Sequence, residues 1–128
     1  MGTSIHDVVG AETVARLRDT IGDRTDAVVA VATTDCRMVW ASDAGSAEMF
    51  GRSQADFEGH SQYDYIHPED QTTFRRKMAA ALRGETVRYA VRAMGADGSW
   101  VRVVSVAWLV QTPEEPLIVS IAVPGHAD

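Results

Sequence analysis

The chain has 128 residues, of which 45% are hydrophobic and 23% charged, a composition typical of one folded domain rather than a disordered chain. Its formal net charge of −6 gives a field that repels polyanions, so we expect no nucleic-acid partner. No apolar run reaches the roughly 20 residues that cross a bilayer, and the single Cys36 excludes an internal disulfide, which together favour a soluble cytoplasmic protein without a membrane partner.

The first 25 residues predict an amphipathic helix ahead of the main domain. Apolar residues recur near helical spacing between Ser4 and Ile21, with charged residues between them. The apolar positions are Ile5, Val8, Val9, Val14, Leu17 and Ile21. Because an isolated helix of this length is marginal in water, this stripe must be covered by the domain's own sheet or by the same helix of a second copy.

Two strands and two short helices are expected next. The runs "AVVAVA" and "MVWA", between residues 27 and 41, are β-branched and flank the turn "TTDCR", which predicts a hairpin. Ser42 or Asp43 would cap a helix through "AGSAEMF". Ser53 would cap a second helix through "QADFE", and Gly59 would end it.

The stretch "YIHPED" predicts the start of a longer helix. Pro68 suits the first helical position, and Glu69 and Asp70 favour the positive helix N-terminus. The helix continues through "TTFRRKMAAALR" and ends at Gly84. Its expected apolar stripe consists of Phe74, Met78, Ala81 and Leu82.

The last third predicts three strands in succession. Apolar and charged residues alternate from Val87 to Arg92, and the Asp-Gly of "GADGS" is a strong hairpin signal. An apolar run from Trp100 to Val110 and another from Leu117 to Val123 are separated by the turn "TPEEP". These segments predict an antiparallel meander.

This order of elements resembles the PAS domain, the small sensor and interaction module of signalling proteins, from about Asp26 to Val123. "TTDCRMVWAS" resembles the family's first hairpin, "AEMFG" and "DFEG" its short helices, "YIHPED" the entry to its long helix, and "VRAMGADGSWVRV" its central hairpin. The leading helix resembles the cap that often precedes the family's core. Two positions depart from the family: Cys36 occupies a turn position where Gly is frequent, and Ser42 stands where Asn is common.

The resemblance implies an α+β fold with a five-stranded antiparallel sheet and short helices packed on one face, preceded by the cap helix. The domain boundaries that follow are 1–25 for the cap, 26–123 for the PAS core and 124–128 for a tail. The resemblance also favours a homodimer in which caps and outer sheet faces meet. We therefore predict that the cap stripe packs on both sheet and partner, with the dimer interface at Ile5, Val9, Val14 and Leu17.

Two cofactors found in the family are not expected. The flavin-binding branch has a reactive cysteine three residues after a Gly like Gly59, and this chain has Gln62 there. The haem-binding branch has its histidine ligand where this chain has Phe74. His60 and His67 are more simply capping or hydrogen-bonding residues. Neither cofactor nor metal is predicted, although an unknown small ligand is compatible with the fold.

Two further questions concern Cys36 and a site at His67. Cys36 is either a redox sensor in an exposed turn or an incidental substitution, and the second is favoured because only Arg37 supplies a nearby cation.

Asp64 and His67 would act as a carboxylate-oriented base if their turn is helical. The sequence offers no phosphate loop, nucleophile elbow or second His at metal-ligand spacing, so we do not expect an enzyme.

The function implied by the resemblance is that of a sensory domain in signal transduction. It would bind a small apolar or aromatic ligand between sheet and helices and relay its state through dimer contacts to an output domain in the same or another chain. The alternative is a module for protein–protein interaction with a filled core and no ligand. The expected ligand-binding residues are Trp40, Phe50, Tyr63, Ile66, Phe74, Met78 and Trp108.

Overall fold

A computed structural model describes residues 4–125, including all side chains in this range except those of Asp43 and Ala44. Five strands form one antiparallel sheet in the order β2-β1-β5-β4-β3. Their bounds are β1 Val28–Thr33, β2 Met38–Ala41, β3 Val87–Met94, β4 Trp100–Val110 and β5 Leu117–Pro124. The expected α+β fold with a five-stranded antiparallel sheet is confirmed. Strand β5 extends to Pro124 and Gly125 still bonds to β4, so the predicted tail begins inside the sheet, and residues 126–128 lie outside the described residues.

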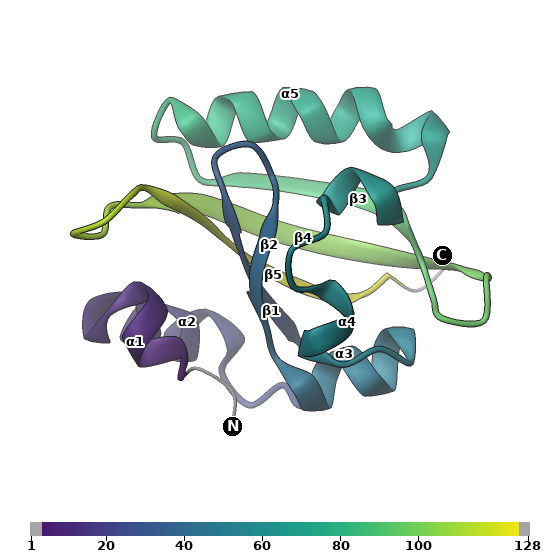
Figure 1. Ribbon diagram of the computed structural model, residues 1–128, viewed down its shortest axis with the longest axis horizontal. Coiled ribbons are helices and arrows are strands. Elements are labelled where there is room, and N and C mark those ends of the chain that lie inside the picture. Colours follow the sequence, from purple (N-terminus) through teal and green to yellow (C-terminus); the bar gives the residue numbers. More distant parts are fainter. Residues whose placement is uncertain (1–3, 126–128) are drawn as a thin grey trace.

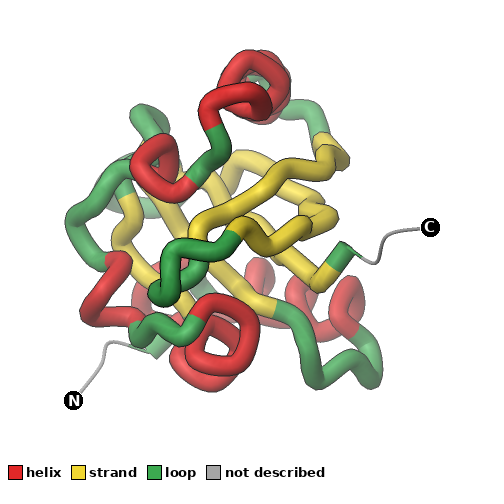
Figure 2. The backbone as a smooth tube through the Cα atoms, turned by 90° about the vertical axis from the view of Figure 1, so that its right-hand side faces the viewer, coloured by secondary structure: helices red, strands yellow, loops and turns green. Residues whose placement is uncertain are grey.

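Helices cover both faces of this sheet. Figure 1 shows α5 on one side of the strands with α1 and α2 on the other, and Figure 2 shows the strands as a layer between helices. The helices are α1 Ile5–Val9, α2 Ala11–Ile21, α3 Asp43–Phe50, α4 Gln54–Phe57 and α5 Gln71–Leu82, with 3₁₀ turns η1 Gln62–Tyr65 and η2 Pro68–Asp70. We call the face under α5 the inner face, and the face under α2 the outer face.

The leading helix is two helices rather than the single one predicted. Gly10 has φ 86° between α1 and α2, a conformation that residues with a side chain rarely adopt, so the chain turns there. Val9, Val14 and Leu17 are buried against the outer face, and Ile5 packs at the margin of this cluster. The cluster's sheet residues include Val31, Val106, Trp108, Val119 and Ile121.

The chain's own sheet is therefore the surface that covers the cap stripe. With Val9 7%, Val14 4% and Leu17 4% exposed, these side chains have almost no area left for a second copy. Val9, Val14 and Leu17 could form the predicted dimer interface only if a partner displaced the cap from the sheet. The interface predicted at the half-buried Ile5 stays a prediction. A homodimer through another surface stays a prediction.

The predicted cap at Ser53 is confirmed, whereas Ser42 occupies the N-cap position of α3 without a side-chain capping bond. Ser53 and Asp56 form a reciprocal capping box at the start of α4. The Ser42 hydroxyl instead accepts a hydrogen bond from the backbone N–H of Val29 at 3.0 Å, which ties the start of α3 to β1. The side chain of Asp43, the other proposed cap, lies outside the description.

The entry to the long helix has two steps. Pro68 begins the 3₁₀ turn η2, and α5 starts only at Gln71. Phe74, Met78 and Ala81 of the predicted stripe are buried on the inner face, but Leu82 is 42% exposed and does not belong to it. No helix within residues 4–125 is long and apolar enough to span a membrane.

Candidate functional site

A cavity of about 90 Å³ lies between the inner face of the sheet and the helices. All five strands contribute to its lining together with α3, α4, α5 and η1. The lining residues are Val28, Ala30, Met38, Ala41, Phe50, Phe57, Gln62, Tyr65, Ile66, Phe74, Tyr89, Val91, Ala93, Val103, Ser105, Ser120 and Ala122. The cavity is thus mostly apolar, with a few polar groups in its wall.

Aromatic rings form much of the helical wall. Phe57 packs edge-on against Phe50 and Tyr65, with ring centroids 6.0 and 5.1 Å apart. Phe74 packs edge-on against Tyr89 at 5.7 Å. Because such edge-to-face pairs are preferred geometries, the wall is held in a defined shape.

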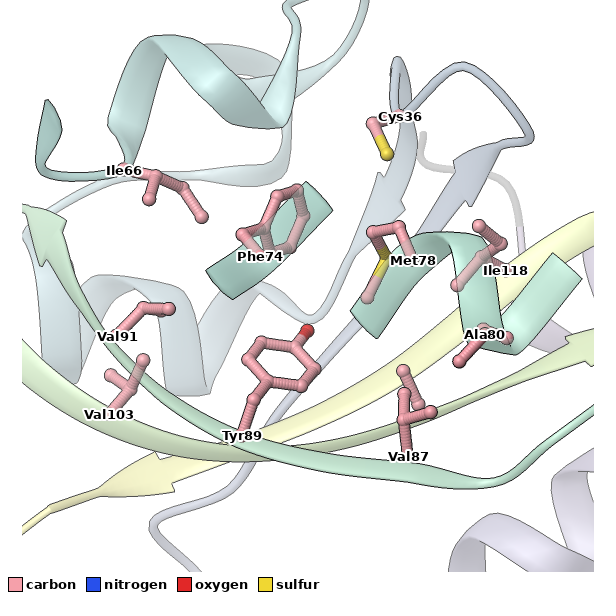
Figure 3. Close-up of a cluster of buried hydrophobic side chains, with 12 residues drawn as sticks. Cys36, Ile66, Phe74, Met78, Ala80, Val87, Tyr89, Val91, Val103 and Ile118 are labelled. Atoms are coloured by element: carbon pink, nitrogen blue, oxygen red, sulfur yellow. The ribbon is translucent and has the colours of Figure 1, made fainter. Parts of the chain in front are cut away.

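The polar side chains of the wall are Gln62, Tyr65, Tyr89, Ser105 and Ser120. The Oε1 atom of Gln62 is inaccessible to solvent and has no hydrogen-bond partner among the described residues. Burial raises the pKa of Tyr89 far above its ordinary value, a hydrogen bond with Ser105 acting in the opposite direction, so the phenol keeps its proton. Figure 3 shows the Tyr89 hydroxyl rising from β3 toward Phe74 and Met78 of α5.

An ion pair fastens the start of α5 to the sheet beside this cavity. Asp70 accepts hydrogen bonds from the backbone N–H and the Nε of Arg92 at 2.8 and 2.9 Å, and from Nη2 at 2.9 Å. Hydrogen bonding by Arg92 lowers the pKa of Asp70 to about 2. His67 donates its backbone N–H to the carbonyl of Arg92 at 2.9 Å, and Ile66 forms a bridge with Ala93. The η1–η2 segment is thereby held along the edge of β3.

Three of the predicted ligand-binding residues lie together along the cavity. Phe50, Ile66 and Phe74 line it from the helical side. Tyr63 and Met78 belong to the same core cluster as Phe74, with the Tyr63 ring 5.2 Å from that of Phe74, but they are not lining residues. Whether any of these side chains binds a ligand stays a prediction.

Trp40 and Trp108 do not belong to this group. Both pack in the cluster on the outer face, and the guanidinium of Arg16 from α2 lies 4.0 Å from the centre of the Trp108 ring. Placing them in the wall of the cavity was wrong. Successive side chains of a strand point to opposite faces, and the inner positions of β4 include Ser105 and Ala107, which puts Trp108 on the outer face.

The polar wall of the cavity was not predicted from the sequence. Ser105 and Ser120 interrupt the apolar runs of two buried strands, and a hydroxyl in such a run is the signal that would have located them. Gln62 was considered only as the replacement for a flavin-reactive cysteine. Its buried amide had no sequence signal, because η1 looks like an exposed polar turn.

Cys36 is buried rather than exposed. Its φ is 67°, in the left-handed region where glycine is favoured, and its side chain is 3% exposed within the core cluster. Burial, with a smaller effect of the Asp35 carboxylate, raises the pKa of the Cys36 thiol to about 11. A redox sensor in an exposed turn is therefore the wrong description of Cys36.

His67 has the predicted capping role. Its Nδ1 accepts a hydrogen bond from the backbone N–H of Glu69 at 3.1 Å at the start of η2, and its ring lies 4.5 Å from that of Trp100. With Nδ1 engaged by the backbone, a carboxylate such as Asp64 is not needed to orient the ring. Within residues 4–125, no three His, Cys, Asp or Glu side chains cluster so as to hold a metal ion.

Comparison with known protein families gives one match. A family described as the PAS fold matches residues 38–121, which span β2 through most of β5 and include the cavity's helical wall. No curated protein sequence matches the chain.

Solved structures with a similar fold come from very different organisms. The PAS-B domain of Drosophila melanogaster Cycle with bound ethylene glycol has a TM-score of 0.70 at 16% identity, covering 77% of this chain and 99% of that one. A variant of the same domain with bound glycerol has a TM-score of 0.70 at 17% identity, with the same coverage. The PAS domain of an HTR-like protein from Haloarcula marismortui has a TM-score of 0.68 at 17% identity, covering 89% of this chain and 93% of that one. At these identities the likeness is one of fold.

Proposed function

The chain belongs to the PAS family, and we propose that it acts as a sensory domain that binds a small ligand in the cavity between its sheet and its helices. The observation that carries the proposal is Gln62 Oε1, a buried acceptor without a partner at the edge of an apolar cavity. A buried acceptor left without a donor costs about 1–3 kcal/mol. A ligand that donates a hydrogen bond there recovers this cost and is selected by it.

The lining restricts the chemistry of this ligand. Its body meets aromatic rings and aliphatic strand residues, so it is largely apolar. It carries at least one O–H or N–H for Gln62. A formal charge is unsuitable because the cavity offers hydroxyls and an amide but no lining side chain of opposite charge.

The size of the cavity limits the ligand further. Drug-sized ligands occupy pockets of about 300–1,000 Å³, and a cavity of about 150 Å³ holds benzene. The cavity of about 90 Å³ therefore suits a compound of only a few heavy atoms unless the helices move. Ethylene glycol and glycerol, named with the Cycle structures, are of this size. The small volume also supports the expectation that neither haem nor flavin is bound.

The helical wall offers a route for relaying the ligand's state. Phe74 lines the cavity from α5, and α5 begins directly after Asp70, which is fastened to Arg92 on β3. A ligand pressing on Phe74 would shift α5 against that fastening, and an output domain in the same or another chain would respond. The alternative, an interaction module without a ligand, keeps the fold but leaves the cavity unused.

Native mass spectrometry and thermal shift against a panel of small alcohols, amides and phenols test the proposal. Ala30 lines the cavity, so Ala30→Leu should abolish any stabilisation by a panel compound. Ala79→Leu makes the same change at an exposed position of α5 and should preserve it. No retained mass and no stabilisation by the panel would leave the interaction module as the better description.

A further inference from the structure

The outer face of the sheet is covered over only part of its area. Helices α1 and α2 pack over residues of β1, β2, β5 and the C-terminal half of β4. Beyond them lies a row of small apolar residues at paired positions of three neighbouring strands: Ala90 of β3 opposite Val104 of β4, and Val104 opposite Val123 of β5. We call these three residues the apolar row.

Two residues of this row, Ala90 and Val104, are exposed, and Val123 is half-buried. Val104 is 43% exposed, and Ala90 is exposed while its neighbours Tyr89 and Val91 are buried on the inner face. Trp100, at the start of β4, is 41% exposed and lies on the same side of the hairpin as Arg102. Exposed apolar side chains gathered on one face are typical of a contact surface rather than of a free one.

Arginines surround the apolar row even though the whole chain is acidic, with a net charge of −6. Arg88 precedes Ala90 by two positions on β3, and Arg102 precedes Val104 by two on β4, so both share the outer face with the row. Both side chains are exposed, and neither forms an ion pair with a carboxylate of the described residues. The surface is therefore locally cationic.

The pairing of Arg92 with Arg102 points to an absent anion. These residues lie directly opposite each other on β3 and β4, and like charges at such positions destabilise a sheet. Asp70 and Glu69 compensate the charge of Arg92. A hollow beside this pair is lined by Asp70, Ala90, Val91, Arg92, Trp100 and Arg102. The Asp70 carboxylate in it is bonded to Arg92, so Arg102 is the cation of this hollow that has no carboxylate partner among the described residues.

We propose that this part of the outer face binds an acidic amphipathic protein segment, with apolar side chains on the row Ala90–Val104–Val123 and carboxylates on Arg88 and Arg102. Helix α2 packs its apolar stripe on the adjoining area, so this face of the sheet accepts an amphipathic helix. Charge complementarity selects the partner: a second copy docking face to face would oppose arginines to arginines. A nucleic acid would place phosphates over the apolar row at its centre.

Docking is on the face and not at the edge of the sheet. Although β3 is an edge strand, the backbone N–H of Arg92 is bonded to Asp70 and its carbonyl to His67, and Ala93 is bridged to Ile66. An added strand is blocked along this stretch, so the partner contributes side chains rather than a ladder of backbone hydrogen bonds.

The test uses a designed helical peptide of about 18 residues with a leucine stripe flanked by glutamates, and its counterpart with lysines in place of the glutamates. Amide NMR spectra of the whole chain should shift with the glutamate peptide at Ala90, Val104 and Val123. The double variant Arg88→Glu with Arg102→Glu should bind the glutamate peptide roughly tenfold or more weakly and should bind the lysine peptide more tightly than the glutamate peptide. The milder change Arg102→Gln should also weaken binding of the glutamate peptide, but that peptide should still bind more tightly than the lysine peptide.

The control is Arg18→Glu with Arg76→Glu, which changes the net charge equally at exposed helical positions and should leave binding unchanged. The proposal is overturned if both peptides bind equally, if neither binds, or if the control weakens binding as much. It is also overturned if a single-stranded oligonucleotide binds more tightly than the glutamate peptide. Sedimentation that shows a dimer dissolved by the Arg88 and Arg102 changes would assign the face to a second copy instead.

Discussion

Asp70 and Arg92 join the start of α5 to the edge strand of the sheet through both oxygens of the carboxylate and three N–H groups of the arginine. One of these N–H groups belongs to the backbone, so the contact fixes the position of β3 itself and not only a side chain. The helix that carries Phe74 is thereby set at a defined distance from the cavity floor at Tyr89.

We predict that Asp70→Asn lowers the free energy of unfolding by about 1 kcal/mol at neutral pH, since solvent around the half-exposed Arg92 screens the pair. The pKa of Asp70 is about 2 in the fold against an ordinary 3.8, so this stabilisation is complete above the ordinary value and is lost as pH falls toward 2. Urea unfolding between pH 7 and pH 2 measures both effects. Glu85→Gln, which removes an exposed pair with Arg83, should change little.

The second prediction concerns the unpartnered amide. Gln62→Leu should raise the free energy of unfolding of the ligand-free protein by about 1 kcal/mol, because it removes a buried acceptor without a donor. It should also abolish stabilisation by any compound that binds the wild-type cavity. Gln111→Leu changes an exposed residue and should do neither. A destabilised Gln62→Leu protein would mean that the amide is already satisfied in the ligand-free fold.

The third prediction concerns the left-handed turn at Cys36. Cys36→Gly should be more stable than Cys36→Ala by about 1 kcal/mol, because alanine keeps the cost of a positive φ while glycine removes it. At most other sites the alanine variant is the more stable of the two. Chemical denaturation of the two variants decides it, and an alanine variant of equal or greater stability would contradict the assigned turn geometry.

The fourth prediction concerns the approach of α3 to β1. A Cβ at Gly45 would lie 2.6 Å from the carbonyl oxygen of Ala27 and 3.1 Å from Cγ2 of Val28. Gly45→Ala should therefore lower the free energy of unfolding by about 1–3 kcal/mol, although glycine-to-alanine changes inside helices usually stabilise. Ala47→Gly, at an exposed position of the same helix, should cost about 1 kcal/mol. Thermal unfolding compares the two, and a stabilised Gly45→Ala protein would rule out the close contact.

The elements were predictable because their signals are local. The capping box at Ser53, the Asp-Gly turn before Ser99 and the proline-led start of η2 each act through neighbouring residues. Gly10 was the exception: the apolar spacing on either side of it is helical, and only its positive φ divides α1 from α2.

The faces of the sheet were not predictable from alternation. The first five residues of β5 are all buried, because helices cover both sides of that strand, so the sequence shows an apolar run with no period of two. For the same reason, the sequence pattern did not show that Trp40 and Trp108 lie on the outer face of the sheet. Exposure of Leu82 likewise depends on where α5 ends over the sheet, which the helical spacing alone does not report.

A crystal structure of the protein, soaked with the panel compound that raises its melting temperature most, tests the central claim most directly. We predict continuous density larger than a water molecule in the cavity lined by Phe74 and Tyr89, with a donor within hydrogen-bond distance of Gln62 Oε1. Density for the compound only elsewhere, with the cavity empty or holding separate water molecules, would contradict it.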